Sequence, residues 1–365
     1  YIIHRYFGLV ILGLICIHPV LVQLADDMLF IPFQLRYWPE FTGLFLAFLL
    51  LGMVLGALWR IPLGLPYHWW WRLHRVTAVV VPVVLFIHVL NVSETFEDGF
   101  PRQATFAVAG LYFVLYAWVK TRSWRIRSHP YIITAVESAG EEAHSINIKP
   151  QIKENSKNDA PGTPHYFPGQ FAFVTLQSDN ISSEEHPFTI ASSPSRPGTL
   201  QFIIRNSGDW TSHIPEVQPG DHLFLDGPYG LFTHLRCASS REIIMIAGGI
   251  GITPMLSMLR YMADTKDSRR VTLLWSNKTQ KHVIYPKEMD TLQSSLPGLQ
   301  LVHIFTAQGA KKRLDQARLA QLLSGCSLES AIFVCGPPQM MTSIHTFLQG
   351  MGYPRRQIFM ERFNL

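Results

Sequence analysis

Four long apolar segments occupy the first third of the chain, at roughly 3–23, 41–59, 76–92 and 103–119. Each approaches the ~20 residues that an α-helix needs to cross about 30 Å of hydrocarbon. Beyond residue 120 no apolar run reaches this length, and charged residues, Gly and Pro become frequent. The pattern predicts a membrane-embedded helical bundle at residues 1–122 and a change of architecture near Ser123–Pro130.

The remaining residues follow two further patterns. Strand-like runs broken by Pro and Gly turns predict a small antiparallel β-barrel at residues 129–235. These runs are Tyr131–Val136, Gln170–Leu176, Leu200–Arg205 and His222–Leu225. Alternating strands and helices predict an α/β domain with a parallel sheet at residues 240–365. These segments are Ile243–Ala247, Pro254–Tyr261, Val271–Trp275, Leu301–Phe305, Leu314–Leu323, Ala331–Cys335 and Gln339–Gly350. The polar segment Lys153–Pro164 is expected to be a flexible insertion.

The composition favours a membrane protein. Charged residues make up 16% of the chain and hydrophobic residues 48%, whereas soluble domains usually carry about 25% charged residues. The net charge is +5, but the basic residues flank apolar segments and form no aromatic-interleaved patch, so we expect no nucleic-acid partner. The basic clusters are Arg60, Arg72 and Arg75, and then Lys120, Arg122, Arg125 and Arg127. The other loops carry Asp26, Asp27, Glu40, Glu94, Glu97 and Asp98. The positive-inside rule then predicts that the C-terminal half is cytosolic.

The cysteines and the chain start add two expectations. Cys16, Cys237, Cys326 and Cys335 form no CxxC pair and no plausible zinc set. We expect the last three to lie in a reduced compartment. The sequence begins at Tyr1, inside an apolar run and without Met, so we expect it to be a fragment.

Four histidines in the apolar segments have a matched spacing. His4 and His18 lie in the first segment and His74 and His88 in the third, and each pair is 14 residues apart (18 − 4 and 88 − 74). Fourteen helical residues return to within about 40° of the same face and rise ~21 Å. The two helices run parallel, so His4 faces His74 and His18 faces His88. Facing imidazoles are the axial ligands of a six-coordinate haem. The alternative is four hydrogen-bonded core histidines, although ionisable residues in lipid are costly.

A second motif suits a flavin. His186–Thr189 follows a strand entry at Pro168–Phe171, and Arg205 precedes Gly208–Thr211. Thr189 offers a hydroxyl for the reactive ring nitrogen, Phe188 apolar cover, and Arg205 a cation for the pyrophosphate. The alternative is an ordinary β-hairpin. The residues predicted to hold FAD are His186, Pro187, Phe188, Thr189, Arg205, Trp210 and Thr211.

Glycine turns after buried strands suit a dinucleotide. The turn Gly248–Gly251 follows one strand and opens a helix at Pro254, where the helix N-terminus favours a pyrophosphate. Cys335 ends another parallel strand, near the nicotinamide edge, although it is alternatively a buried small residue. No acid follows Trp275, which favours NADPH over NADH, with Lys278 as the 2′-phosphate contact or a plain surface lysine. The residues predicted here are Gly227, Gly230, Gly248, Gly249, Gly251, Thr253, Pro254, Lys278, Cys335, Gly336 and Pro337.

With these motifs the chain resembles the NADPH oxidase and ferric reductase superfamily, and most closely its NADPH oxidase branch. The resemblance rests on the paired histidines and on HPFTIASSP, RNSGDWT, GPYG, GGIGITP and CGPPQM. It implies a ferric-reductase-type membrane bundle followed by a ferredoxin–NADP reductase-like module. Members usually have six spans, so it implies that two are missing before residue 1. It also implies that Phe363 shields the flavin ring.

The expected activity is transmembrane electron transfer. Electrons pass from NADPH to FAD and then to two b-type haems, with Thr189, Cys335 and Phe363 around the hydride-transfer site. The expected acceptor is O2, which gives superoxide; a ferric chelate is the alternative. A second alternative is a membrane-anchored flavin reductase that serves a protein partner. The sequence predicts neither regulatory subunits nor an oligomeric state.

Overall fold

The computed structural model describes residues 2–25, 31–59, 62–64, 67–151, 164–307 and 314–363. The chain separates into two compact units, residues 1–122 and 123–365. Most of the predicted insertion Lys153–Pro164 lies outside the described residues.

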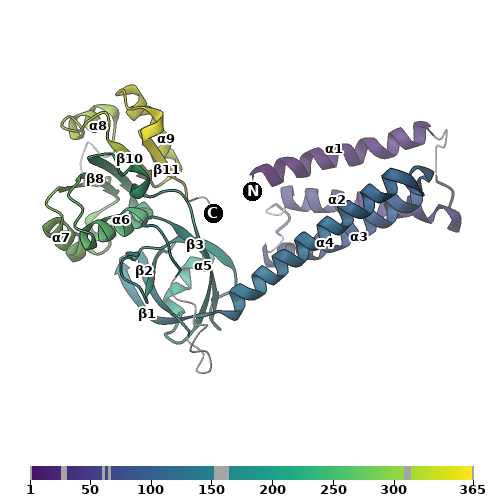
Figure 1. Ribbon diagram of the computed structural model, residues 1–365, viewed down its shortest axis with the longest axis horizontal. Helices are drawn as coiled ribbons and strands as arrows, with labels where there is room; N and C mark the ends of the chain where they lie inside the picture. Colours follow the sequence, from purple (N-terminus) through teal and green to yellow (C-terminus); the bar gives the residue numbers. More distant parts are fainter. Residues whose placement is uncertain are drawn as a thin grey trace. The chain divides into compact units, whose positions relative to one another are not determined.

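The first unit consists of long helices (Figure 1). They are α1 (Ile2–Ala25), α2 (Trp38–Trp59), α3 (Tyr67–Val92) and α4 (Gly99–Ser128), with short turns η1 (Leu35–Tyr37) and η2 (Glu94–Phe96). All four long helices are long and apolar enough to cross a membrane. The four predicted apolar helices are thereby confirmed.

Two helices extend beyond the apolar segments that predict them. Helix α3 starts nine residues before residue 76 (76 − 67), and α4 ends nine residues after residue 119 (128 − 119). The added turns are rich in Arg, Lys and Trp. Arg and Lys are good helix formers, so the helix continues where the hydrophobic pattern stops.

The first half of the second unit is an antiparallel barrel. Its strands are β1 (Tyr131–Gly140), β2 (Ala143–Pro150), β3 (Phe171–Gln177), β4 (Glu185–Thr189), β5 (Leu200–Arg205) and β6 (His222–Tyr229). The sheet order is β4-β3-β6-β1-β2-β5, and a bridge between Ile190 and Phe202 joins its two edges. Buried Ile146, Ile148 and Phe202 lie in its core. The predicted barrel is confirmed, with β2 and β4 added. Helix α5 (Asp209–Ser212) and turns η3 (Ile214–Glu216) and η4 (His234–Cys237) complete this half.

The second half is an α/β domain with a parallel sheet, as predicted. The strands are β7 (Glu242–Gly248), β8 (Arg270–Asn277), β9 (Leu299–Phe305), β10 (Ala331–Cys335) and β11 (Ile358–Glu361), in the order β11-β10-β7-β8-β9. The helices are α6 (Thr253–Asp264), α7 (Pro286–Ser295), α8 (Gln316–Leu322) and α9 (Pro338–Gly350). Short turns are η5 (Gly249–Ile252), η6 (Gln280–His282) and η7 (Arg355–Gln357).

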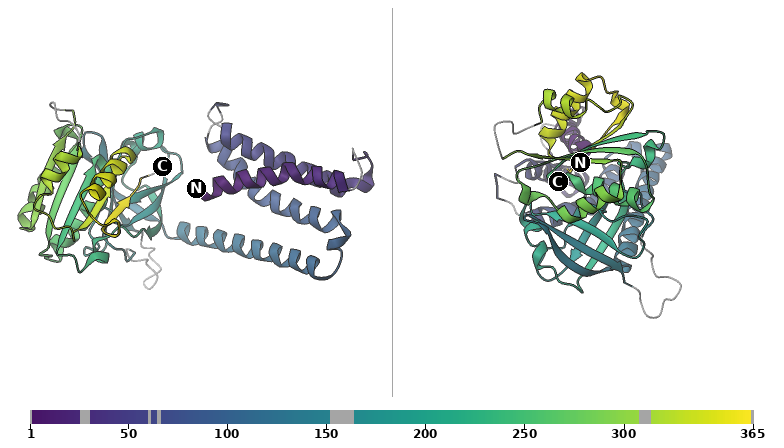
Figure 2. Two further views of the ribbon diagram at one scale, coloured as in Figure 1. Left: turned by 90° about the horizontal axis from the view of Figure 1, so that it is seen from above. Right: turned by 90° about the vertical axis from the view of Figure 1, so that its left-hand side faces the viewer.

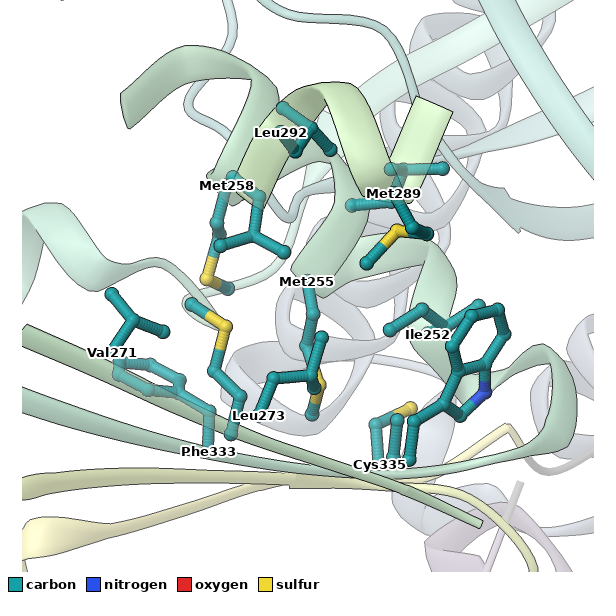
Figure 3. Packing of buried hydrophobic residues seen from close by; sticks show 14 of the residues in the cluster. Ile252, Met255, Met258, Val271, Leu273, Met289, Leu292, Phe333 and Cys335 are labelled. Atoms are coloured by element: carbon teal, nitrogen blue, oxygen red, sulfur yellow. The ribbon is translucent and has the colours of Figure 1, made fainter. Parts of the chain in front are cut away.

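Both faces of this sheet are covered by helices (Figure 2). Met255 of α6 and Met289 of α7 pack against Leu273 and Phe333 on one face (Figure 3). Leu319 of α8 and the buried residues of α9 pack on the other face. Because successive side chains of a strand point to opposite faces, strands buried on both sides read as the continuous apolar runs seen in the sequence.

Candidate functional site

The strand order of the parallel sheet reverses between two neighbouring strands. The chain passes from β7 to β8 and β9 on one side and later returns to β10 and β11 on the other. Ligands of open α/β sheets bind beyond the carboxyl ends of the strands at such a switch point. The glycine turn that follows β7 and the segment Gly336-Pro337 that follows β10 therefore share one edge.

Two glycines let these segments approach each other. A Cβ at Gly251 would lie 2.4 Å from the carbonyl oxygen of Cys335, and one at Gly248 would lie 2.6 Å from Cδ of Pro337. Gly249 adopts a positive φ of 54°, which glycine reaches at no steric cost. The predicted residues Gly248, Gly249, Gly251 and Pro337 are thus brought together.

The start of α6 is built from the next predicted residues. Thr253 and Pro254 form its first turn, and both are buried. The hydroxyl of Thr253 donates a hydrogen bond to the carbonyl oxygen of Ile250 at 3.1 Å. Gly336 has a φ of 156°, and a Cβ there would lie 2.7 Å from Cε of Met340. These residues shape the turn through backbone and packing contacts.

A cleft of about 470 Å³ opens at this edge of the sheet. Its lining includes Arg205, Gly248, Gly249, Ser276, Asn277, Lys278, His282, Thr306, Pro337 and Gln339. Lys278, the predicted 2′-phosphate contact, is exposed and lies in this cleft. No motif in the sequence points to Asn277, which is 4% exposed and whose side-chain amide has no hydrogen-bond partner among the described residues. A buried amide left unpaired costs about 1–3 kcal/mol, so a polar ligand group would stabilise it.

Arg205 also lies in this cleft, although the sequence predicts it beside the FAD pyrophosphate. One terminal guanidinium nitrogen would be 3.4 Å from a Cβ at Gly249. Its Nε lies 3.5 Å from a carboxylate oxygen of Glu142, and Nε2 of His282 lies 3.6 Å from the other. The turn between β1 and β2 thereby holds an acid that orients Arg205 towards the glycine turn.

The flavin motif packs around one tryptophan. On β4 the rings of His186 and Phe188 lie 4.3 and 5.9 Å from the ring of Trp210. The indole Nε1 of Trp210 donates to the carbonyl oxygen of Ser182 at 2.8 Å. Burial lowers the pKa of His186, and the nearby carboxylate of Glu184 opposes this. The structure thus joins two motifs that are over 20 residues apart in sequence.

The neighbouring predicted residues have backbone roles. Pro187 pairs with Phe173 on β3, and Thr189 is 6% exposed. The hydroxyl oxygen of Thr211 accepts from the backbone N–H groups of Ser207 and Gly208 at 2.8 and 3.0 Å. Thr211 therefore fixes the turn that presents Trp210.

The GPYG motif closes the barrel beside β3. A Cβ at Gly227 would lie 2.7 Å from that of Ala172, and Gly230 adopts a φ of 100°. The side-chain amide of Gln170 donates to the carbonyl oxygen of Gly230 at 2.9 Å. Gly227 and Gly230 thus allow close backbone packing, which the sequence analysis did not foresee.

The last two strands and the residues after them carry three further groups. Cys335 on β10 pairs with Glu361 on β11 and with Ala247 on β7. Its thiol is fully buried against the α6 side of the sheet (Figure 3), and burial raises its pKa. Burial also raises the pKa of the Glu361 carboxyl, a residue the sequence analysis does not single out. Phe363 follows two residues later and is 40% exposed.

In the membrane unit, one predicted histidine pair meets. The ring centres of His4 on α1 and His74 on α3 are 5.8 Å apart, with an angle of 77° between the planes. Trp70 and Trp71 stack beside His74 at 5.9 and 6.3 Å. The Nδ1 atom of His74 is buried and has no hydrogen-bond partner within the described part of the chain.

The second pair is less fully defined. Nδ1 of His88 lies 2.8 Å from the carbonyl oxygen of Pro39 and 3.2 Å from the hydroxyl of Thr42. A Cβ at Gly43 would lie 2.5 Å from Cε1 of His88, so the ring rests directly on α2. His18 is an exposed residue of α1. No cluster of three or more metal-binding side chains occurs among the residues that the structure describes.

Three known families match successive stretches of the chain. Residues 1–85 match the ferric reductase like transmembrane component, residues 156–233 an FAD-binding domain, and residues 245–346 an oxidoreductase NAD-binding domain. These matches define a membrane-embedded oxidoreductase that depends on FAD and a nicotinamide cofactor. Their combination is the architecture of the NADPH oxidase and ferric reductase superfamily.

Individual relatives cover about half of the chain. The glycine betaine monooxygenase reductase subunit of Pseudomonas aeruginosa is 28% identical over 56% of this chain and 58% of its own length. NADH-cytochrome b5 reductase 2 of Mycosarcoma maydis is 29% identical over 46% of this chain and 51% of its own. The chain thus spans little more than half the length of these relatives.

Solved structures resemble about two thirds of the chain. The FAD/NAD-binding domain of nitric oxide dioxygenase from Vibrio cholerae superposes with a TM-score of 0.55, at 19% identity, over 64% of this chain and 98% of that one. A ferredoxin NADP⁺ reductase from Neisseria gonorrhoeae gives a TM-score of 0.51 at 20% identity, over 64% and 98%. The predicted ferredoxin–NADP reductase-like fold is confirmed.

Proposed function

We propose that this protein carries electrons from cytosolic NADPH, through FAD and two bis-histidine haems, to O2 on the opposite side of the membrane, which becomes superoxide. The observation that carries the proposal is the approach of His4 and His74 from two apolar helices. The cytosolic placement rests on the basic residues at the ends of α2, α3 and α4.

The first histidine pair has the separation that a shared iron requires. Two metal–imidazole bonds of about 2 Å each, with the half-width of each ring, separate the ring centres by roughly 6 Å. The separation of 5.8 Å between His4 and His74 is close to this value. The unpaired Nδ1 of His74 is a further polar atom that the described protein groups leave unsatisfied.

The second histidine pair is proposed from the hydrogen bonds that orient the His88 ring. The carbonyl oxygen of Pro39 can only accept, so Nδ1 of His88 carries the proton and Nε2 keeps its lone pair for a metal. Metal-binding histidines typically donate their other ring N–H in this way. His18, 14 residues beyond His4, is the proposed opposite ligand.

The soluble unit would hold the flavin and the nucleotide. FAD supplies the conversion of a two-electron hydride into single electrons, and haem iron supplies one-electron transfer. We assign FAD to the strand His186–Thr189 with its buried support Trp210, and Phe363 to cover of the flavin ring. Thr189 keeps its proposed place beside the reacting atoms. The Cys335 thiol is fully buried in the core on the α6 side, next to Glu361 of β11, which favours its alternative, a buried small residue.

NADPH is assigned to the cleft at the switch point. Lys278 and Arg205 supply two cations for its phosphates, and the glycine turn allows the pyrophosphate to approach the backbone. The unpaired amide of Asn277 would bind the adenosine ribose or its phosphate. This assignment moves Arg205 from FAD to the nucleotide.

Two other functions have specific support. The family matched at residues 1–85 is described as ferric reductase like, which favours a ferric chelate as acceptor. Relatives that are reductase subunits of oxygenases favour delivery of electrons to a protein partner instead.

A cytochrome c reduction assay with purified protein and NADPH distinguishes these functions. We expect cytochrome c reduction that superoxide dismutase abolishes. Reduction that resists dismutase and rises with ferric citrate would assign the ferric reductase activity. An absence of any haem Soret band would leave only the flavin reductase.

A further inference from the structure

Helix α6 joins the barrel to the parallel sheet. Its first turn follows the glycine turn Gly249–Ile252, at the edge assigned to NADPH. Three of its side chains, Ser257, Arg260 and Asp264, are spaced by three and four residues and therefore share one helix face. That face contacts the segment 191–201, which begins two residues after Thr189 at the end of β4 and ends at the second residue of β5.

Arg260 makes the central contact of this face. One terminal nitrogen donates to the backbone carbonyl of Ala191 at 2.8 Å and to the side-chain oxygen of Gln201 at 2.7 Å. Its Nε and other terminal nitrogen donate to the two carboxylate oxygens of Glu288 at 2.6 and 2.7 Å. A single guanidinium thus bonds α7 on one side and the barrel on the other.

The geometry of this contact is fixed. The Arg260 side chain is 12% exposed, and a bidentate guanidinium–carboxylate pair holds its plane in one orientation. Ala191 is tied in turn, because its N–H donates to the carbonyl oxygen of Gln201 at 2.8 Å. Lysine cannot reproduce this set, since it is a point charge and lacks the planar fork.

The neighbouring contacts on the same face differ in burial. Ser257 donates to the carbonyl oxygen of Ser192 at 2.8 Å. Arg196 pairs with Asp264, but its side chain is 73% exposed. An exposed ion pair contributes little to stability, so the Arg196 pair is a matched control for the buried Arg260 contact.

We propose that Arg260 is a positioning residue for hydride transfer. Arg260 does not line the cleft assigned to NADPH. Through its hydrogen bonds it holds the helix that starts at the nucleotide turn against the backbone that continues from Thr189. The inference rests on the proposed use of FAD and NADPH. Misplacement of reacting groups by about 1 Å costs about 10²-fold in rate, so loosening this contact would slow hydride transfer while both ligands still bind.

The test compares Arg260→Lys, Gln201→Met and the control Arg196→Gln in the full chain. The measurements are the anaerobic rate of flavin reduction at saturating NADPH, the KM for NADPH, the FAD content, and backbone hydrogen exchange of residues 191–201 without cofactors. For Arg260→Lys we expect at least a tenfold slower rate, faster exchange in this segment, and KM and FAD content within twofold. Arg196→Gln should stay within twofold throughout.

Two results would overturn the inference. One is a rate for Arg260→Lys within twofold of the parent. The other is a slower rate that is explained wholly by lost FAD. If Arg260→Lys does not fold, Gln201→Met decides, because it removes the barrel-side acceptor of Arg260 and, besides that, the side-chain donation to Asn147 at 3.1 Å. A threefold or larger decrease in rate supports the inference, and an unchanged rate rejects it. A parent protein that NADPH cannot reduce would instead reject the proposed function.

Discussion

Replacing Gly251 by alanine tests whether the glycine turn and the end of β10 form the nucleotide site. The added methyl would lie 2.4 and 2.6 Å from the carbonyl oxygen and carbon of Cys335 and 2.9 Å from the nitrogen of Gly336. All three are backbone atoms, so no side-chain rotation relieves the clash. Reaching ordinary contact at 3.4 Å requires a shift of about 1 Å (3.4 − 2.4) between the turn and β10.

The expected effects follow from that shift. Overpacking of this kind destabilises a protein by about 1–3 kcal/mol, which for a unit of this size lowers Tm by several degrees. A displacement of 1 Å at a reacting site costs about 10²-fold in rate. We therefore expect slower flavin reduction and weaker NADPH binding in Gly251→Ala, measured by stopped-flow absorbance and calorimetry.

The matched control is Gly325→Ala, because a Cβ at Gly325 meets nothing within 4 Å. It should bind and react like the parent. The reasoning is refuted if Gly251→Ala keeps the NADPH affinity, the flavin-reduction rate and the Tm of the parent protein.

Three other predictions concern separate parts of the molecule. Gly43→Ala should displace the His88 ring, because the new methyl would lie 2.5 Å from it, and should remove about half of the haem absorbance. Gly52→Ala on the same helix, where a Cβ meets nothing within 4 Å, should keep the full absorbance. The same absorbance spectrum for both variants would contradict this prediction. Lys278→Ala should raise the KM for NADPH at least tenfold and leave that for NADH within twofold; a parallel rise in both would mean that Lys278 does not read the 2′-phosphate. Burial, aided by the charge of Arg269, lowers the pKa of His234 to about 4. As the pH falls below 6.5, the unfolded state therefore takes up a proton on this histidine before the folded state does. The free energy of unfolding then decreases by up to about 3 kcal/mol between pH 6.5 and pH 4. Thermal melts of His234→Phe should depend less on pH in that window, and an unchanged slope would contradict the assignment.

The sequence predicts the architecture well because its signals are periodic and long. The four apolar segments and the alternation of strands with helices remain recognisable even where single residues depart from the pattern. The sequence pattern does not indicate strand β4, because Pro187 interrupts it and Pro normally argues against a strand. Helix α7 and strand β11 were missed because one is mostly polar and the other has only four residues.

The sequence can predict a site residue only where a local motif determines the arrangement of the backbone around it. The glycine turns and the 14-residue histidine spacing are such motifs. The place of Arg205 depends on where β5 ends relative to β7, which no local pattern encodes. Asn277 draws attention only through its missing hydrogen-bond partners, and Arg260 only through contacts with residues about 60 to 70 positions away.

The central claim is that paired histidines hold two haems in the membrane unit. The most direct measurement is the reduced-minus-oxidised absorbance spectrum, with haem quantification, of the purified full chain and of His88→Ala. The account predicts b-type bands with two haems per chain in the parent and about half of that signal in the variant. A parent without a Soret band, or a variant that keeps both haems, would contradict it.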